Sequence, residues 1–125
     1  MRQPDIEIYL LACPTDRLIS WLKQNFEVNN SVQTSPSSQT LTLSYQGNDI
    51  PVTILEQAAG KKFTSVWFDS EQTPWETDMD CARQAFTELG CEVRCNAQGW
   101  QEEGEDDPDQ WWRINKNGEG LFIWR

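Results

Sequence analysis

The chain has 125 residues, no histidine and a formal net charge of −10, from 10 Lys or Arg against 20 Asp or Glu. This length is typical of one domain, and we expect a single domain over residues 1–125. Without histidine, the chain cannot use His-based acid–base catalysis, a Ser–His or Cys–His nucleophile pair, or a histidine metal ligand.

The acidic excess lies in the second half of the chain, where residues 63–125 carry 5 Lys or Arg against 14 Asp or Glu. Such a surface repels DNA, RNA and anionic lipid, so we expect no direct nucleic-acid or membrane binding and favour a basic protein partner. The N-terminal residues offer only a short apolar run broken by charge, which resembles neither a signal peptide nor a membrane span. A cytoplasmic location with reduced thiols is therefore predicted.

In the first half of the chain, residues 6–11 predict a strand and residues 13–26 a helix that opens with Pro14. The apolar stripe of this helix comprises Leu18, Ile19, Leu22 and Phe26, with Trp21 at its margin. Residues 29–40 are almost wholly polar and without periodicity, which predicts a polar loop. Residues 41–45 and 50–54 alternate around a Gln-Gly-Asn-Asp turn, which predicts a hairpin.

The middle of the chain predicts a strand, a helix and a second strand. Residues 63–68 are apolar on both faces, as in a central strand. Thr73-Pro74-Trp75-Glu76 matches a capping box with proline at the first helical position, and Gly90 is a typical helix end. The predicted buried stripe is Trp75, Met79, Ala82, Phe86 and Leu89, whereas Asp78 is expected to face water. Residues 91–95 then alternate as a half-buried strand.

The last quarter begins with a predicted acidic loop over residues 97–109. Its charges are Glu102, Glu103, Glu105, Asp106, Asp107 and Asp109. Charges at this density are typical of a solvated loop, but they could also dock a basic protein or mimic a nucleic acid. Residues 111–115 and 121–124 then flank Asn117-Gly118, a strong hairpin signal.

These elements predict an α+β fold with the order β-α-β-β-β-α-β-β-β. Layer packing favours a two-layer sandwich with two helices on one face of a mostly antiparallel sheet, ferredoxin-like or related. Each half contains a strand, an X-Pro helix start, a helix and a following strand. A duplicated βαββ unit is therefore an open alternative.

The C-terminal hairpin provides the most informative candidate site. A turn at Asn117-Gly118 would pair Trp111 with Trp124 and Arg113 with Phe122, and would place all four on one side. Arg above an indole face gives a favourable cation–π contact, and aromatic residues with Arg are typical of interaction surfaces. The alternatives are an ordinary small core, a homodimer or partner surface, and a ligand site.

Two other constellations are weaker. The acids Asp69, Glu71, Glu76, Asp78 and Asp80 follow no calcium-loop pattern and are explained by the helix dipole, so no metal site is predicted. Cys13, Cys81, Cys91 and Cys95 lack zinc-site spacing, and Cys91 and Cys95 lie about 13 Å apart along a strand. We interpret the cysteines as small buried hydrophobic residues.

The sequence thus favours a non-catalytic protein-interaction or inhibitory module that uses the acidic loop and the Trp/Arg hairpin face. No catalytic residue and no cofactor are predicted. One alternative is a small-ligand-binding domain with an aromatic pocket formed by Trp67, Trp75 or Trp100. A second, less favoured alternative is an enzyme that depends on carboxylates or a metal.

Overall fold

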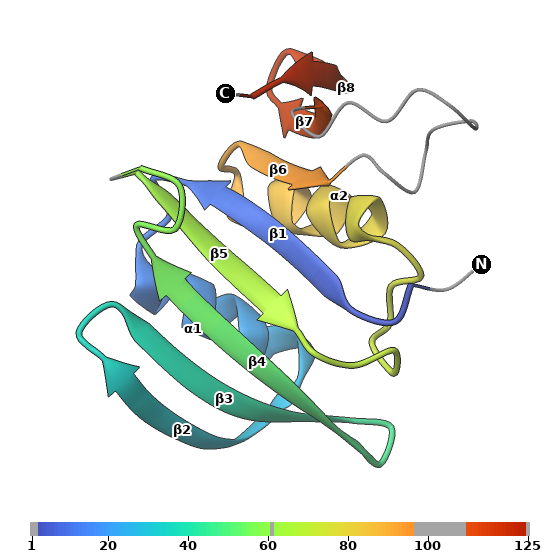
Figure 1. Cartoon of the computed structure of the whole chain (residues 1–125). Coiled ribbons are helices and arrows are strands. Elements are labelled where there is room, and N and C mark those ends of the chain that lie inside the picture. Colours follow the sequence, from blue (N-terminus) through green and yellow to red (C-terminus); the bar gives the residue numbers. More distant parts are fainter. Residues whose placement is uncertain (1–2, 61, 97–109, 125) are drawn as a thin grey trace.

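A computed structural model of the chain describes residues 3–60, 62–96 and 110–124. These residues form one eight-stranded sheet in which every neighbouring pair of strands is antiparallel, with two helices against one face (Figure 1). The elements are β1 (Ile6–Leu11), α1 (Thr15–Asn25), β2 (Glu27–Ser35), β3 (Ser38–Tyr45), β4 (Asn48–Glu56), β5 (Phe63–Phe68), α2 (Asp78–Leu89), β6 (Val93–Asn96), β7 (Gln110–Asn115) and β8 (Gly118–Ile123). The predicted α+β class is confirmed.

The strands lie in the order β2-β3-β4-β5-β1-β6-β7-β8, so the first strand of the chain lies near the centre of the sheet. β1 pairs with β5 on one side and with β6 on the other. The central position predicted for residues 63–68 is confirmed, because β5 lies between β4 and β1. The sheet has one strand more than the predicted order, and that strand is β2.

The prediction of a polar loop over residues 29–40 is wrong, since this segment contains most of β2 and the start of β3. β2 pairs with β3 along its length, and all of its residues except Val28 are exposed. Strand periodicity depends on one face being buried, and neither face of β2 is covered well enough to require apolar residues. A polar edge strand also resists pairing with other chains.

α1 begins and ends close to the predicted bounds, but Trp21 lies in the core and not at the margin. Its ring stacks on Trp75 with 6.0 Å between ring centroids, and its indole N–H donates to Glu88 Oε1 at 2.7 Å. Gln84 links the same helix pair by accepting from Trp75 Nε1 at 2.8 Å and donating to Asn25 at 3.0 Å. This polar network fastens α1 to α2.

α2 begins four residues later than the predicted capping box. Thr77 is the actual N-cap, and its hydroxyl accepts from the backbone N–H of Asp80 at 3.2 Å. The hydroxyl of Thr73 instead closes a local turn, donating to the carbonyl of Trp75 at 2.9 Å. Both segments offer a Thr followed by an acid three residues on, and sequence alone does not choose between them. Gly90 ends the helix with a φ of 77°, as predicted.

The core lies between the helices and the sheet. β1 contributes Ile6, Ile8 and Leu10, all inaccessible to solvent, and residues of both helices and of five other strands belong to the same cluster. The predicted α2 stripe is buried except for Phe86, which is half-buried. Asp78, expected to face water, is buried because its carboxylate accepts from the backbone N–H of Glu7 at 3.0 Å.

The C-terminal hairpin forms with a different turn from the one predicted. β7 and β8 are joined by Lys116 and Asn117, and Trp111 pairs with Phe122 while Arg113 pairs with Gly120. The predicted partners of Trp111 and Arg113 were therefore wrong by two residues. Asn115 Oδ1 accepts from the N–H of Asn117 at 2.9 Å, which places the tight turn before Gly118. A shift of two residues keeps every side chain on its predicted side.

Candidate functional site

The predicted residues Trp111, Arg113, Phe122 and Trp124 are brought together on the side of the sheet that faces away from the helices. Their strand neighbours Trp112 and Ile114 point into the core beneath α2, and alternation along β7 therefore turns Trp111 and Arg113 outward. We call the four outward residues the hairpin face. All four are half-buried, and within the described ranges no helix lies over them (Figure 1). The predicted acidic half of the site, Glu102 to Asp109, lies outside the residues that the structure describes.

Trp124 is the centre of an aromatic cluster on this side. Its ring centroid lies 4.7 Å from that of Phe63, 5.0 Å from Trp111, 5.7 Å from Tyr9 and 6.3 Å from Phe122. Phe63 belongs to β5 and Tyr9 to β1, so the end of the chain packs over the middle of the sheet. Most of these contacts are edge-on or tilted, which suits the quadrupoles of the rings.

Arg94 on β6 lies within this cluster and was not among the predicted site residues. Its guanidinium carbon is 4.6 Å from the ring centre of Phe63, 4.8 Å from Phe122 and 4.5 Å from Trp124. Its side chain is 16% exposed and forms an ion pair with Glu92 at 2.8 Å. One signal was available in the sequence: Arg94 stands between the buried Val93 and Cys95, so strand alternation points it away from the core.

Arg113 provides the cation–π contact that the sequence predicted, although over a different ring. Its guanidinium carbon lies 4.7 Å from the centre of Phe122, and not above an indole. Arg113 is half-buried and has fewer ring contacts than Arg94. Arg94 therefore acts as a structural cation within the cluster, whereas Arg113 is available at its surface.

Glu92 supplies the counter-charge on this side of the sheet. Burial raises the pKa of Glu92, but hydrogen bonds from Asn115 and Arg94 outweigh burial and hold its pKa below the ordinary value. The carboxylate is therefore ionised at neutral pH and keeps Arg94 in place. Tyr9, on the neighbouring strand, has a raised pKa because of burial and the charge of Glu7, and its hydroxyl stays protonated.

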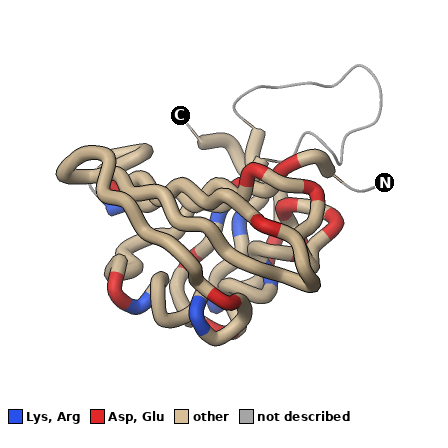
Figure 2. Tube along the Cα trace, turned by 90° about the horizontal axis from the view of Figure 1, so that it is seen from below, with Lys and Arg blue, Asp and Glu red and all other residues tan. Residues whose placement is uncertain are grey.

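The acidic residues that were attributed to helix electrostatics do not bring their side chains together around one point where a metal ion could bind. Figure 2 shows that Asp and Glu positions gather on the side of the molecule near the N-terminus. Among the residues described here, no group of three Cys, Asp or Glu side chains is placed to hold a metal ion. Asp78 differs from its neighbours because burial, with the charges of Asp5 and Glu7, raises its pKa to about 6 against the hydrogen bonds from Glu7 and Gln3.

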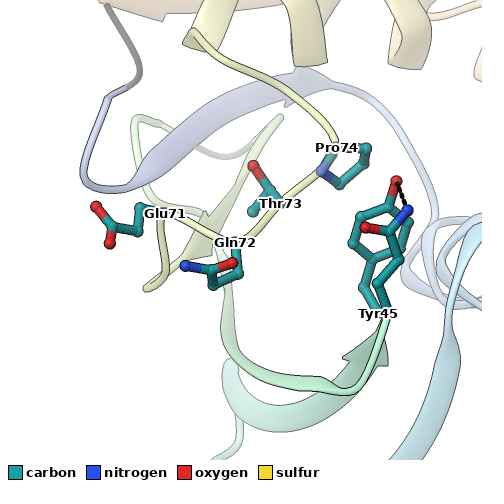
Figure 3. Close-up of a pocket in the computed structure, with 6 residues that line it drawn as sticks. Tyr45, Glu71, Gln72, Thr73 and Pro74 are labelled. Carbon is teal, nitrogen blue, oxygen red and sulfur yellow. Dashed lines mark hydrogen bonds between the residues drawn. The ribbon is translucent and has the colours of Figure 1, made fainter.

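A separate pocket opens between the β3–β4 turn and the segment before α2 (Figure 3). Its volume is about 420 Å³, within the range of small-molecule sites. The lining residues are Tyr45, Gln46, Glu71, Gln72, Thr73 and Pro74. The lining offers one aromatic ring, two side-chain amides and one carboxylate, and so suits a small polar ligand.

Neither Trp67 nor Trp75 lines any of the pockets described above or below. Trp75 is 4% exposed and packs against Trp21, Phe26 and Phe68. Trp67 is half-buried, and its indole N–H donates to Asp5 at 2.7 Å. Trp100 lies outside the described residues.

Comparison with models of known protein families, with curated protein sequences and with solved structures found no match. Neither of the helices in the described ranges is long and apolar enough to cross a membrane.

Asp78→Asn is expected to raise the free energy of unfolding at pH 7 by about 1–3 kcal/mol. The folded carboxyl has a pKa of about 6 against an ordinary value of 3.8, so it holds more proton than the unfolded chain between these values. The contribution of the Asp78 carboxyl to the free energy of unfolding therefore falls as the pH rises from 3.8 to about 6, and it is constant above that range. Urea unfolding at several pH values should show a gain at pH 7 that disappears near pH 4. Asp80→Asn, on the exposed side of the same helix turn, is the control, and a pH-independent gain for Asp78→Asn would contradict the expectation.

Arg94→Met is expected to lower the free energy of unfolding by about 1–3 kcal/mol, because it removes three ring contacts and leaves a half-buried Glu92 without its cation. Arg113→Ala should lower the free energy of unfolding by less than about 0.5 kcal/mol, since Arg113 is partly exposed and its cation–π contact is with one ring, that of Phe122. Chemical denaturation of the two variants gives the comparison. A larger loss for Arg113→Ala would show that the roles are assigned the wrong way round.

Proposed function

We propose that the protein is a non-catalytic binding module whose contact surface is the hairpin face. The observation that carries this proposal is a cluster of half-buried aromatic rings and one accessible arginine on the side of the sheet away from both helices. Tryptophan and arginine are the residues that most often dominate binding energy at interfaces. The acidic segment at residues 102–109 is a second candidate contact, and the proposal does not depend on it.

The partner that suits this surface is a protein with apolar side chains framed by basic ones. Trp111, Phe122 and Trp124 provide a semi-rigid apolar centre, because Trp124 packs on the other two rings and Arg94 packs on Phe122 and Trp124. The chain as a whole carries a net charge of −10, which attracts a basic partner and speeds its association at low salt. A second copy of this chain would offer a complementary apolar centre, but its own net charge of −10 would repel the first copy.

The test compares three immobilised forms of the protein as baits for partners from the native host's lysate. The double variant Arg113→Ala/Phe122→Ala should lose at least about tenfold in capture, or about 1.4 kcal/mol of contact. Val32→Ala is the matched control, because Val32 is an exposed apolar residue on β2 at the opposite edge of the sheet. Raising the salt from about 50 to about 500 mM should weaken capture by the wild type.

Two results would overturn the proposal. Equal capture by all three forms would show that partners bind elsewhere, provided that unfolding curves show the double variant to be folded. A stable dimer in light scattering that the double variant dissociates would reassign the hairpin face to self-association.

The pocket at Tyr45 supports a second candidate function, the binding of a small polar ligand. Glu71 is the charged residue of its lining, so a small organic cation is the ligand class that it suits. Titration with an alkyl diamine should shift the amide NMR signals of residues 71–73 saturably, and Glu71→Gln should abolish the shift. Signals that do not move, or that move equally in the variant, would reject this candidate.

We also propose that the fold is a two-layer sandwich related to the ferredoxin-like arrangement. Two β-α-β units, β1-α1-β2 and β5-α2-β6, begin with adjacent central strands, and both helices lie on one face. Because β4, and not β2, lies beside β5, the first unit would close with β4, and the strands β2 and β3 on one side and β7 and β8 on the other would be additions. The element order β-α-β-β-β occurs twice, which also keeps a duplicated unit open. An experimental structure with other neighbours for β1 would overturn the ferredoxin-like relation.

A further inference from the structure

Two cysteines that are 78 positions apart in the sequence lie together at one end of the sheet. Cys13 stands between β1 and α1, and Cys91 stands just after α2. A backbone hydrogen bond of 3.0 Å from Leu11 N–H to the carbonyl of Glu92 holds the two segments side by side. Cys13 is two residues beyond Leu11 and Cys91 is one residue before Glu92, so this hydrogen bond places the two cysteines next to each other. They are free thiols in the reduced chain.

We propose that Cys13 and Cys91 form an oxidant-sensitive dithiol, which a hydroperoxide converts into a disulfide within the chain. The proposal goes beyond the binding function and does not depend on it, since neither cysteine belongs to the hairpin face.

The surroundings give the two thiols different roles. The hydrogen bond from Cys91 lowers the pKa of Cys13 against the opposing effect of burial, and the nearby charge of Arg17 lowers it further. The same hydrogen bond, together with burial, raises the pKa of Cys91. The Arg17 guanidinium lies close to Gly90, the residue before Cys91, with its Nη2 4.0 Å from the place where a Cβ of residue 90 would be. Cys13 is therefore the nucleophile and Cys91 the resolving thiol.

Solvent reaches this pair but not the other two cysteines. Cys13 is 7% exposed, and its exposed part lines an open pocket of about 340 Å³, whose other walls include Thr15, Glu56 and Lys62. Cys91 is half-buried, whereas Cys81 and Cys95 have no exposed surface. A small hydroperoxide can therefore reach Cys13 without unfolding of the chain.

The chemistry consumes one peroxide for each disulfide. The Cys13 thiolate attacks one peroxide oxygen, the O–O bond breaks, and hydroxide leaves and takes up a proton to form water. The Cys91 sulfur then attacks the sulfur of the Cys13 sulfenic acid, the S–O bond breaks, and the departing hydroxide takes the Cys91 proton as a second water. Two thiols are oxidised by two electrons in total, and the peroxide is reduced to two molecules of water.

The experiment treats the reduced, folded full-length protein with hydrogen peroxide, blocks the remaining thiols with N-ethylmaleimide under denaturing conditions, and measures the intact mass and the tryptic peptides. The expected product is a monomer with two blocked thiols and a mass about 2 Da lower before blocking. Cleavage after Lys and Arg releases Cys13 in peptide 3–17 and Cys91 in peptide 84–94, so the linked pair is identified directly. A reducing agent should separate the two peptides.

Three single variants provide the controls. Cys13→Ser should stop peroxide consumption, and Cys91→Ser should leave a sulfenic acid on Cys13 that a dimedone probe traps. Cys81→Ser should oxidise like the wild type. The proposal is overturned if peroxide leaves four blocked thiols, if the linked peptides contain Cys81 or Cys95, or if the only disulfides join separate chains. Because Cys13 and Cys81 are both buried in the core, unfolding curves of all three variants should show that a loss of oxidation is not caused by misfolding.

Discussion

In the described part of the chain, two short helices lie against an eight-stranded sheet that they cannot cover, and much of the structure follows from this shortage of cover. Eight strands at about 4.8 Å spacing span roughly 34 Å, whereas two helices side by side cover about 20 Å. α1 and α2, of 11 and 12 residues, lie over the middle of one face. Everything beyond them must be polar, must be covered by other side chains, or must stay exposed. All three outcomes occur: β2 is polar, the centre of the opposite face is covered by Trp124, and Leu121 and Ile123 at the β8 edge are 46% and 48% exposed.

The opposite face shows how a sheet can be partly covered by its own hairpin. Tyr9, Phe63 and Arg94 come from three adjacent strands, and they would be more exposed to solvent without Trp124, which follows β8. Trp124 packs on all three, and it does so as an extension of β8 and not as a new layer. The half-buried Arg94 among rings is stable here because Glu92 neutralises it and Asn115 fixes Glu92. This cover is thin, and so the rings remain half-exposed and able to meet a partner.

The limits of sequence prediction follow the same division. Elements beneath the helices were predictable, because burial on one face imposes a period: the α2 stripe, β5 and the β3–β4 hairpin show it. β2 was missed because no burial imposes a period on its sequence. The start of α2 was misplaced because Thr73 and Thr77 give equivalent local signals, and only the contact of Asp78 with β1 favours the second. The hairpin face was predictable in composition because side-chain alternation survives a shift of two residues, whereas Arg94 and the Cys13–Cys91 pair depend on which strands become neighbours, which periodicity does not encode.

β1 contacts α2 or the residues just after it at both of its ends. Both contacts involve groups whose protonation or oxidation state depends on the solution. At the start of β1, the carboxylate of Asp78 accepts the N–H of Glu7, and burial makes its ionisation unfavourable. Just beyond the end of β1, Cys13 lies near Cys91, which follows α2, because the Leu11 N–H donates to the Glu92 carbonyl. Between these points α2 packs over β1, β6 and β7, and β7 carries two residues of the hairpin face. The titrating carboxyl and the proposed dithiol therefore lie at opposite ends of the same helix-to-strand contact, which supports the hairpin face from behind. Neither group takes part in the pairing of β1 with β5 and β6 on which the sheet depends.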